Sequence, residues 1–180
     1  PIATWQPSLK LPAGEVGEVV VRGPNVTRRY HGREDLTAMA KIADGDQVWH
    51  RMGDDGRFDD MGRLWFCGRK SQRVTTATET LFTTPCEAVF NTHERVFRSA
   101  LVGVRRNGAV EPVMCVELEH DGRPVDTRRI ETELLEIGRA HHHTRGIERV
   151  LFHHSFPVDV RHNAKIFREK LAVWATRQLS

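Results

Sequence analysis

The chain has 180 residues, of which 39 % are hydrophobic and 28 % charged, and its 27 Lys and Arg against 24 Asp and Glu give a net charge of +3. No apolar run approaches the ~20 residues of a transmembrane helix, so we expect a soluble globular protein of one domain or two small ones. The basic residues are spread along the chain without a block interleaved with aromatic residues, which argues against nucleic acid as a partner.

The three cysteines, Cys67, Cys86 and Cys115, are far apart and odd in number, and two of them sit in apolar runs. This pattern does not fit a disulfide framework, so we expect reduced core residues. No signal peptide opens the chain, and a cytoplasmic location is therefore expected.

The first 70 residues have the composition of a β-rich unit with short connections. Residues 1–14 contain three prolines and predict an entering loop, and we expect the chain to be cut from something larger. Residues 17–23 are a β-branched run bounded by glycines and predict a strand. Residues 35–41 predict a short helix, and residues 44–46 a turn.

A hairpin in this unit carries the first candidate site. Residues 59–62, with Asp early and Gly late, predict a tight turn between strand-like residues 56–58 and 63–67. The hairpin brings Asp54 and Arg69, which are 15 positions apart, towards one end of the same sheet. A carboxylate there can accept hydrogen bonds from a vicinal diol, and an arginine can meet a phosphate or a hydroxyl. On composition alone, solvated charges on a surface hairpin remain the alternative.

After this hairpin the β-type runs give way to a mixture of helix and strand signals, and we place a hinge at Lys70 and Ser71. The chain is thereby divided into a β-rich subdomain, residues 1–70, and an α+β domain, residues 71–180. The fold class that we predict for the whole chain is α+β.

The second unit opens on a helix signal. Thr84 is followed by Pro85 and, three positions after the threonine, by Glu87. This is the pattern of a capping box, so we predict a helix from about residue 85 to residue 91 with Thr84 as its N-cap.

A hairpin and two helices are predicted further on. Residues 96–104 and 112–119 are strand-like runs joined around Asn107-Gly108, the strongest short hairpin signal. Residues 150–152 predict a third strand. A helix should open at Asp126 or Thr127 and end at Gly146, because apolar residues recur at helical spacing between them. The last helix is predicted over residues 167–178.

The tract His141-His142-His143 lies near the end of a helical pattern. Three consecutive residues of a helix point in different directions and cannot all face one ion. We expect solvated or cap-region histidines, and no metal site is predicted.

The remaining candidate is Lys165, which we expect on a loop at the start of the last helix. It follows a small residue, Ala164, and lies between Pro157 and Arg168. Without further information, a solvated lysine at a helix start is the simpler interpretation.

Three motifs, in this order, resemble core motifs of the adenylate-forming superfamily, which includes acyl-CoA synthetases, luciferases and the adenylation domains of peptide synthetases. Residues 49–54 and 68–71 resemble its seventh and eighth motifs. Pro157, Lys165 and Arg168 resemble its tenth, with Ala164 in place of the usual glycine.

The resemblance implies an AMP-forming, ATP-dependent ligase. Residues 1–70 would be the small β-barrel-like subdomain that ends the large adenylation domain, and residues 71–180 a mobile lid made of a two-stranded hairpin, a further strand and flanking helices. ATP and Mg²⁺ are the implied cofactors, with the Mg²⁺ ligands outside this chain. The chain alone is expected to be inactive, because the phosphate-binding loop and the adenine pocket also lie outside it.

The resemblance also implies a role for each site residue. Lys165 would be the catalytic residue that meets the carboxylate of the acid and the α-phosphate of ATP. Asp54 would hold the ribose hydroxyls, and Arg69 the ribose or phosphate. The usual hinge residue is Asp or Lys, so the hinge at Ser71 rests on position and not on residue type.

Within the superfamily, the segments RMGD, GRLWFCGRK and VDVRHNAKIFREKLA are similar to the olefin β-lactone synthetases of bacterial hydrocarbon biosynthesis. These enzymes use ATP to convert a long-chain β-hydroxy acid to a β-lactone. Acyl-CoA synthetases carry a glycine after the hinge, in a segment that turns into the active site for thioester formation, whereas this chain has none between Lys70 and Pro85.

The implied partners are a long-chain β-hydroxy acid, the missing N-terminal adenylation domain and other olefin-biosynthesis enzymes. The first alternative is a fatty acyl-CoA synthetase or acyl-AMP ligase. The second alternative, from another class, is a non-catalytic α+β interaction module.

Overall fold

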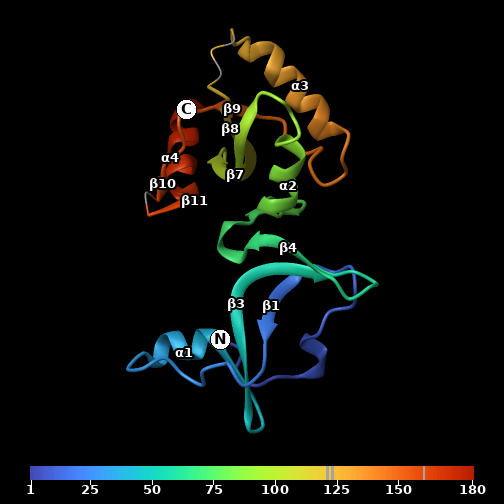
Figure 1. Cartoon of the computed structure of the whole chain (residues 1–180), viewed down its shortest axis with the longest axis vertical. Coiled ribbons are helices and arrows are strands. Elements are labelled where there is room, and N and C mark those ends of the chain that lie inside the picture. The colour runs from blue at the N-terminus through green and yellow to red at the C-terminus, as the bar shows by residue number, and fades with distance from the viewer. Residues whose placement is uncertain (121, 123, 160) are drawn as a thin grey trace. The chain divides into compact units, whose positions relative to one another are not determined.

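Figure 1 shows the computed structural model of the chain, which describes residues 1–120, 122, 124–159 and 161–180. The chain divides into two compact units, Pro1–Ser71 and Gln72–Ser180. None of the helices in the described part of the chain combines the length and hydropathy that a transmembrane span requires. The chain contains both helices and several sheets, so the predicted α+β class is confirmed.

The first unit is built around the long strand β3 (Gln47–Phe58), which Figure 1 shows as a strongly curved ribbon. β1 (Gly17–Val21) pairs along one edge of β3, and β2 (Lys41–Asp44) and β4 (Leu64–Arg69) pair in succession along the other, all antiparallel. Because β2 and β4 share one edge of β3, the described strands form an open sheet. They do not close into the barrel-like form that the resemblance implied.

The predicted elements of this unit are present, but the strand expected over residues 56–58 is only the end of β3, which begins at Gln47, and β2 was not predicted. The predicted strand corresponds to β1, and the predicted short helix to α1 (Glu34–Ala40). The hairpin around residues 59–62 joins β3 to β4. A 3₁₀ helix, Pro7–Leu9, lies in the loop that leads into the unit.

The second unit has a three-stranded sheet at its centre, in the order β7-β8-β9. β7 (Val96–Arg106) and β8 (Ala109–Leu118) form the predicted antiparallel hairpin, and β9 (Val150–Phe152) runs parallel to β8. At the turn Asn107 has φ +50° and Gly108 φ +81°. Both positive angles suit a two-residue hairpin turn, so both strands continue up to it.

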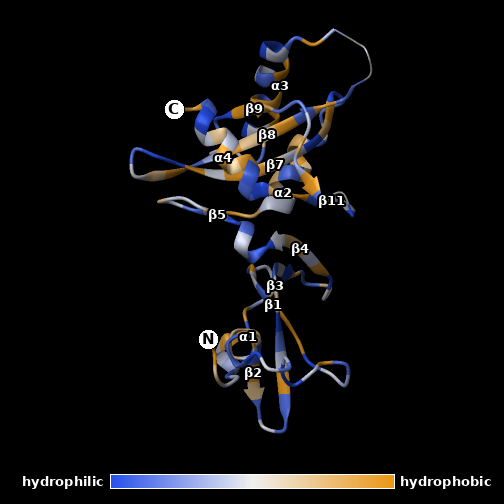
Figure 2. Cartoon of the chain, turned by 90° about the vertical axis from the view of Figure 1, so that its left-hand side faces the viewer, coloured by the Kyte–Doolittle hydropathy of each residue, from blue (hydrophilic) through white to orange (hydrophobic). Residues whose placement is uncertain are grey.

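Helices cover both faces of this sheet. α2 (Thr83–Phe90) and α3 (Thr127–Arg139) pack on one face, and α4 (Arg168–Gln178) packs on the other (Figure 1). Figure 2 shows β8 as a largely hydrophobic strand in the middle of the unit. Buried residues alternate between the two faces along β7 and β8, as the two-residue period of a strand requires. On the α2 and α3 side they include Leu101, Met114 and Val116; on the α4 side they include Ala100, Val102, Val113 and Cys115.

Two small hairpins complete the second unit. β5 (Val74–Thr75) pairs with β6 (Thr80–Leu81) in a segment for which the sequence predicted nothing, and β10 (Val158–Asp159) pairs with β11 (His162–Ile166) just before α4.

The predicted capping box is wrong. α2 begins at Thr83 with Phe82 as its N-cap, so Thr84 lies inside the first turn and its side chain caps nothing. The carboxylate of Glu87 instead accepts hydrogen bonds from Leu101 N and from Arg168. These partners come from distant parts of the chain, so the local sequence pattern could not predict them.

The predicted end of α3 is also wrong. Its start is correct, because Asp126 is the N-cap and accepts a hydrogen bond from Arg129 N at 3.1 Å. The helix ends at Arg139 and not at Gly146. The buried hydroxyl of Thr144 folds back and donates to Gly138 O at 2.7 Å, so the chain turns away before the glycine.

Candidate functional site

Asp54 and Arg69 meet at the junction of β3 and β4. They are Cα partners in the ladder, and Arg69 Nη1 lies 2.9 Å from Asp54 Oδ1. Arg69 Nη1 also donates to Met52 O at 3.3 Å. The predicted meeting of a carboxylate and a guanidinium at one end of the sheet is therefore confirmed, whereas their roles towards a nucleotide stay predictions.

A bulge in β3 sets the direction of the Asp54 side chain. Between the pairs Val20↔Arg51 and Glu18↔Asp55, β3 has two residues more than β1. Gly53 lies in this bulge with φ +68°, a conformation that glycine adopts without steric penalty. A β-bulge redirects the next side chain, which here is the Asp54 carboxylate.

The Asp54 carboxylate keeps unused hydrogen-bonding capacity. Its side chain is 20 % exposed, against 59 % for Arg69. The ion pair does not have the geometry of a hydrogen bond, and within the described ranges nothing donates a hydrogen bond to Oδ1. A carboxylate oxygen that accepts nothing can take a hydroxyl donor, provided that the exposed arginine moves aside.

Sequence reasoning missed Glu18, which holds the predicted hinge residue Lys70. Glu18 Oε2 accepts from Lys70 Nζ at 2.8 Å and from Arg51 Nη2 at 2.6 Å. Burial by itself would raise the pKa of Glu18, but the hydrogen bonds from these two cations outweigh it and lower the pKa. Lys70 is thereby fixed to the first unit, whose last residue is Ser71. That Lys70 and Ser71 act as a hinge stays a prediction.

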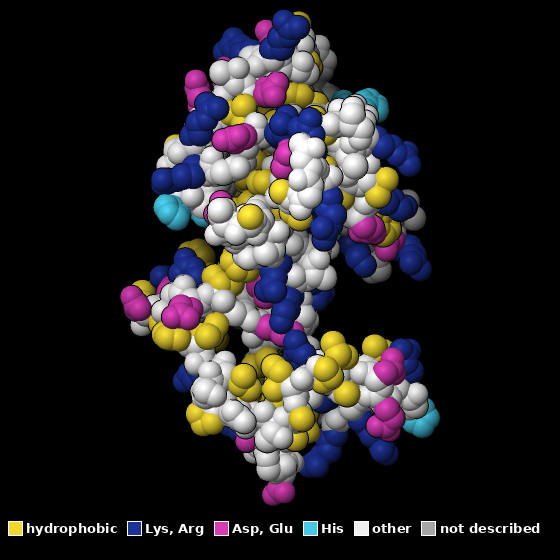
Figure 3. Space-filling view, turned by 180° about the vertical axis from the view of Figure 1, so that it is seen from behind, with side chains coloured by type: hydrophobic (Ala, Val, Ile, Leu, Met, Phe, Trp, Pro, Cys, Tyr) yellow, Lys and Arg dark blue, Asp and Glu magenta, His cyan; other side chains and the backbone are white. Residues whose placement is uncertain are grey.

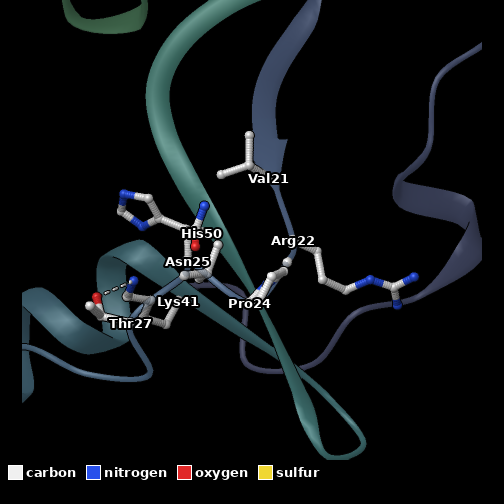
Figure 4. Close-up of a pocket in the computed structure, with 9 residues that line it drawn as sticks. Val21, Arg22, Pro24, Asn25, Thr27, Lys41 and His50 are labelled. Atoms are coloured by element: carbon white, nitrogen blue, oxygen red, sulfur yellow. Dashed lines mark hydrogen bonds between the residues drawn. The ribbon is translucent and has the colours of Figure 1, made fainter.

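A pocket of about 390 Å³ lies between the end of β1 and the start of β2 (Figure 4). Lys41 Nζ lies 3.3 Å from Thr27 Oγ1 and 5.5 Å from the centre of the Tyr30 ring, and burial lowers its pKa. In Figure 4 the Arg22 side chain points away from Lys41. The ammonium thus has a hydroxyl and an aromatic ring as partners, which is the arrangement of a packed lysine.

Lys165 lies on strand β11 and not on a loop at the helix start, which corrects the sequence prediction. The helix begins three residues later, at Arg168. The Lys165 side chain is exposed, and within the described ranges it makes no ion pair. Local sequence did not reveal the strand, because β11 depends on pairing with β10, where Val158 lies opposite Ile166.

Arg168 and Glu87 form a buried ion pair that sequence reasoning also missed. Arg168 Nη2 lies 2.7 Å from Glu87 Oε2, and the two side chains are 16 % and 11 % exposed. Glu87 Oε1 accepts from Leu101 N at 2.8 Å. Burial raises the pKa of Glu87, and the charge of Arg168 opposes this shift. The sequence feature that could have indicated this pair is Glu87 itself, a charged residue on the apolar face of the helix predicted over residues 85–91.

Among the described residues, the histidine tract and the cysteines make no ion pair with the candidate site residues, although Cys86 directly precedes Glu87. The three histidines are exposed, and His143 Nε2 lies 3.3 Å from Pro85 O. All three cysteines are free and buried, as predicted. Burial raises the pKa of Cys86 and Cys115 to about 12, so these thiols stay protonated and unreactive at neutral pH.

Comparison of the sequence with known proteins identifies relatives over nearly its whole length. The chain is 52 % identical to the olefin β-lactone synthetase of Xanthomonas campestris pv. campestris over 98 % of its length, and 50 % identical to that of Stenotrophomonas maltophilia over 99 %. It spans 33 % of each of these relatives. No protein-family model matches the chain.

The structure agrees with this result. The chain superimposes on o-succinylbenzoate CoA synthetase from Bacillus subtilis, whose structure contains an acyl-adenylate intermediate, with a TM-score of 0.74 and 23 % identity. The match covers 95 % of this chain and 33 % of that protein and, at this identity, shows a shared fold. The chain is therefore homologous to the C-terminal portion of the olefin β-lactone synthetases, and it has the fold of the C-terminal portion of adenylate-forming ligases.

Proposed function

We propose that this chain is the C-terminal part of an ATP-dependent enzyme that adenylates a long-chain β-hydroxy acid and closes it to a β-lactone. The observation that carries the proposal is the 50–52 % identity to olefin β-lactone synthetases over 98–99 % of the chain. Since the chain spans a third of those relatives, the complete activity would belong to a longer protein.

In the first step of the proposed reaction, a carboxylate oxygen of the acid bonds to the α-phosphorus of ATP and pyrophosphate leaves. Negative charge builds up on oxygens that water no longer screens. The ammonium of Lys165, on a flexible stem and without an ion-pair partner in the described part of the chain, suits the role of stabilising this charge. Lys165 would be the catalytic residue.

Asp54 and Arg69 would hold the nucleotide. The free hydrogen-bonding capacity of Asp54 Oδ1 suits the two hydroxyls of a ribose, because one carboxylate can accept both hydroxyl hydrogens. Arg69, which is exposed and beside this carboxylate, would turn to the ribose or phosphate. Mg²⁺ would accompany ATP, with ligands in the part of the protein outside this chain.

In the second step, the β-hydroxyl oxygen of the substrate attacks the activated carbonyl, AMP leaves, and the hydroxyl proton passes to a base. The attack is intramolecular, so no second substrate is needed, and the reactivity of the mixed anhydride offsets the strain of a four-membered ring. The absence of glycine between Lys70 and Pro85, where coenzyme A ligases carry one, supports a reaction without an entering thiol.

The first unit carries a surface suited to the remainder of such a protein. Of the residues that the structure describes, Ile42 and Cys67 are the two buried hydrophobic ones in this unit. Twelve of the 15 exposed large hydrophobic residues lie here, and Figure 3 shows hydrophobic side chains at the surface. A groove of about 680 Å³ lined by Trp5, Leu11, Trp49 and Leu64 runs among them. Exposed apolar surface of this extent marks a contact with another protein surface, here the N-terminal adenylation domain.

The proposed enzyme would act in the cytoplasm, which the three free, buried cysteines support. Other olefin-biosynthesis enzymes would be its partners, because the β-lactone synthetases that the chain resembles belong to bacterial hydrocarbon biosynthesis.

The test is to supply the full-length protein with ATP and 3-hydroxyhexadecanoic acid in the absence of coenzyme A. We expect release of pyrophosphate and AMP and a β-lactone by mass spectrometry. Consumption of coenzyme A, with an acyl thioester as the main product, would replace the proposal with a fatty acyl-CoA synthetase. Binding without any turnover would favour the non-catalytic module.

A further inference from the structure

Lys165 lies on an arm formed by β10 and β11, and both ends of this arm are attached to buried carboxylates. The arm enters after Phe156 and leaves at Arg168. Phe167 N donates to Pro157 O at 2.9 Å, and Val158 lies opposite Ile166 in the ladder. Its two ends are therefore held side by side.

The entering end is attached to Glu117. Phe156 N donates to Glu117 Oε2 at 2.7 Å, and Arg98 Nε donates to the same oxygen at 2.8 Å. The Glu117 side chain is 5 % exposed, and the Phe156 ring packs in the core on the α4 side of the sheet. The strand that carries this carboxylate, β8, is the central strand of the sheet.

The leaving end is attached to Glu87. Its Oε2 accepts from Arg168 Nη2 at 2.7 Å, three residues after Lys165, and its Oε1 accepts from Leu101 N at 2.8 Å. Leu101 belongs to β7, the strand at the edge of the sheet. Glu87 thus joins α2, the sheet edge and the first residue of α4 through one carboxylate.

Each attachment has the same chemistry: a buried carboxylate that accepts from one backbone N–H and one arginine. Hydrogen bonds to a buried charge are stronger than neutral ones, and the arginine provides the counter-charge that makes burial tolerable. A lysine side chain is long and flexible, so the backbone that carries it must be fixed if its ammonium is to reach one phosphorus atom reproducibly.

We propose that Glu87 and Glu117 are positioning residues, which hold the two ends of the Lys165 arm to the sheet so that the lysine is presented in one place for acyl-adenylate formation. The inference rests on the proposed function, because it assigns these glutamates a task only if Lys165 takes part in the first step. The two carboxylates act through Lys165 and do not touch the reacting atoms.

The experiment uses the full-length protein and the variants Glu87→Gln and Glu117→Leu. At position 87, glutamine keeps the shape and the acceptor for Leu101 N but loses the charge that holds Arg168. At position 117, leucine removes the acceptor for Phe156 N, which a glutamine would keep. We expect each variant to lower the kcat of ATP–pyrophosphate exchange with 3-hydroxyhexadecanoic acid by about tenfold or more, with the KM for ATP nearly unchanged. The matched control is Glu133→Gln in α3, whose carboxylate pairs with Arg129 of the same helix and with His93, which follows α2.

The decisive readout is a double-mutant cycle with Lys165→Ala. If the glutamates act through the lysine, adding Glu87→Gln to Lys165→Ala lowers exchange no further. Equal losses with and without the lysine would show a merely structural role, and a variant at position 87 or 117 with full exchange would also overturn the proposal. If Lys165→Ala alone keeps full exchange, the proposed function of Lys165 is wrong. This outcome can be distinguished from one in which Lys165 is required but the two glutamates do not position it.

A folding control keeps the result interpretable. Thermal unfolding and circular dichroism would identify a variant at position 87 or 117 that does not fold. In that case Arg168→Lys, which retains the charge but shortens its reach, serves in its place. We expect it to lower exchange less than Arg168→Met does, and equal losses in the two arginine variants would contradict the role of the ion pair with Glu87.

Discussion

Asp54 and Arg69 face one another across the β3–β4 ladder, with Arg69 Nη1 2.9 Å from Asp54 Oδ1, although the chain between them turns through a complete hairpin. The carboxylate is largely covered, whereas the guanidinium is mostly exposed. Because the guanidinium is the exposed partner and the ion pair lacks the geometry of a hydrogen bond, the arginine is the side chain that would turn away if the pair opened to receive a ribose.

Asp54→Asn in the full-length protein should weaken ATP binding without unfolding the protein. Loss of a charged acceptor for two hydroxyls should raise the KM for ATP about 10- to 100-fold, since a hydrogen bond to a charged group is worth about 1.5–3 kcal/mol. The ATP dependence of pyrophosphate release measures it. Asp44→Asn is the control, because Asp44 is also paired with an arginine, Arg22, in the first unit. Equal KM values for both variants would contradict a ribose role for Asp54.

Gly53→Ala should strain the bulge that directs Asp54. No atom lies within 4 Å of an added Cβ, so the penalty comes from the backbone angle of +68° alone. A left-handed conformation costs about 1–2 kcal/mol for most residues, and less for asparagine. Chemical denaturation should therefore give the highest free energy of unfolding for the wild type, a lower one for Gly53→Asn and the lowest for Gly53→Ala. If alanine and asparagine are equally destabilising, backbone strain is not the cause.

Lys165→Ala should remove most of acyl-adenylate formation. Loss of one group that stabilises developing charge lowers kcat by about 10²- to 10³-fold. The KM for ATP should change little, because the ammonium acts mainly in the transition state. ATP–pyrophosphate exchange measures this, and Lys170→Ala, at an exposed lysine in α4, is the control. A kcat within a factor of about two of the wild type would exclude Lys165 as the catalytic residue.

Asp59 should make the β3–β4 hairpin sensitive to acid. A hydrogen bond from Trp65 Nε1 and others from Arg63 and Met61 lower the pKa of Asp59 from 3.8 to about 2. Since the pKa is lower in the folded state, the stabilisation is complete above 3.8 and is lost as the pH falls through about 2. The difference in unfolding free energy between the wild type and Asp59→Asn should shrink over this range. A difference that is constant with pH would contradict the assignment.

Local sequence predicted the elements whose stabilising contacts lie within a few residues. The Asn107-Gly108 turn needs only two residues that tolerate positive φ, and the hairpin of β7 and β8 follows from it. The N-cap of α3 needs only Asp126 and an N–H three residues away. The sequence motifs likewise indicated the candidate residues Asp54, Arg69 and Lys165.

Local sequence failed where the partner is distant. Thr84 and Glu87 have the spacing of a capping box, yet the Glu87 carboxylate bonds to Arg168, which is 81 positions away. Glu18 similarly holds Lys70 at a separation of 52 positions. The periodic patterns of helices and strands cannot reveal such pairs, because the pairs form only after the sheet and its helices have packed.

By itself, the sequence determined the α+β class and most of the hairpins and helices, and it singled out the candidate residues, because turns, caps and periodic apolar faces act over short range. Only the tertiary structure decided that Lys165 lies on a strand, that its arm ends at two buried glutamates, and that Arg69 rests against Asp54. Such contacts depend on the burial of charge, and a buried charge selects its partner by proximity in the folded chain and not by spacing along it.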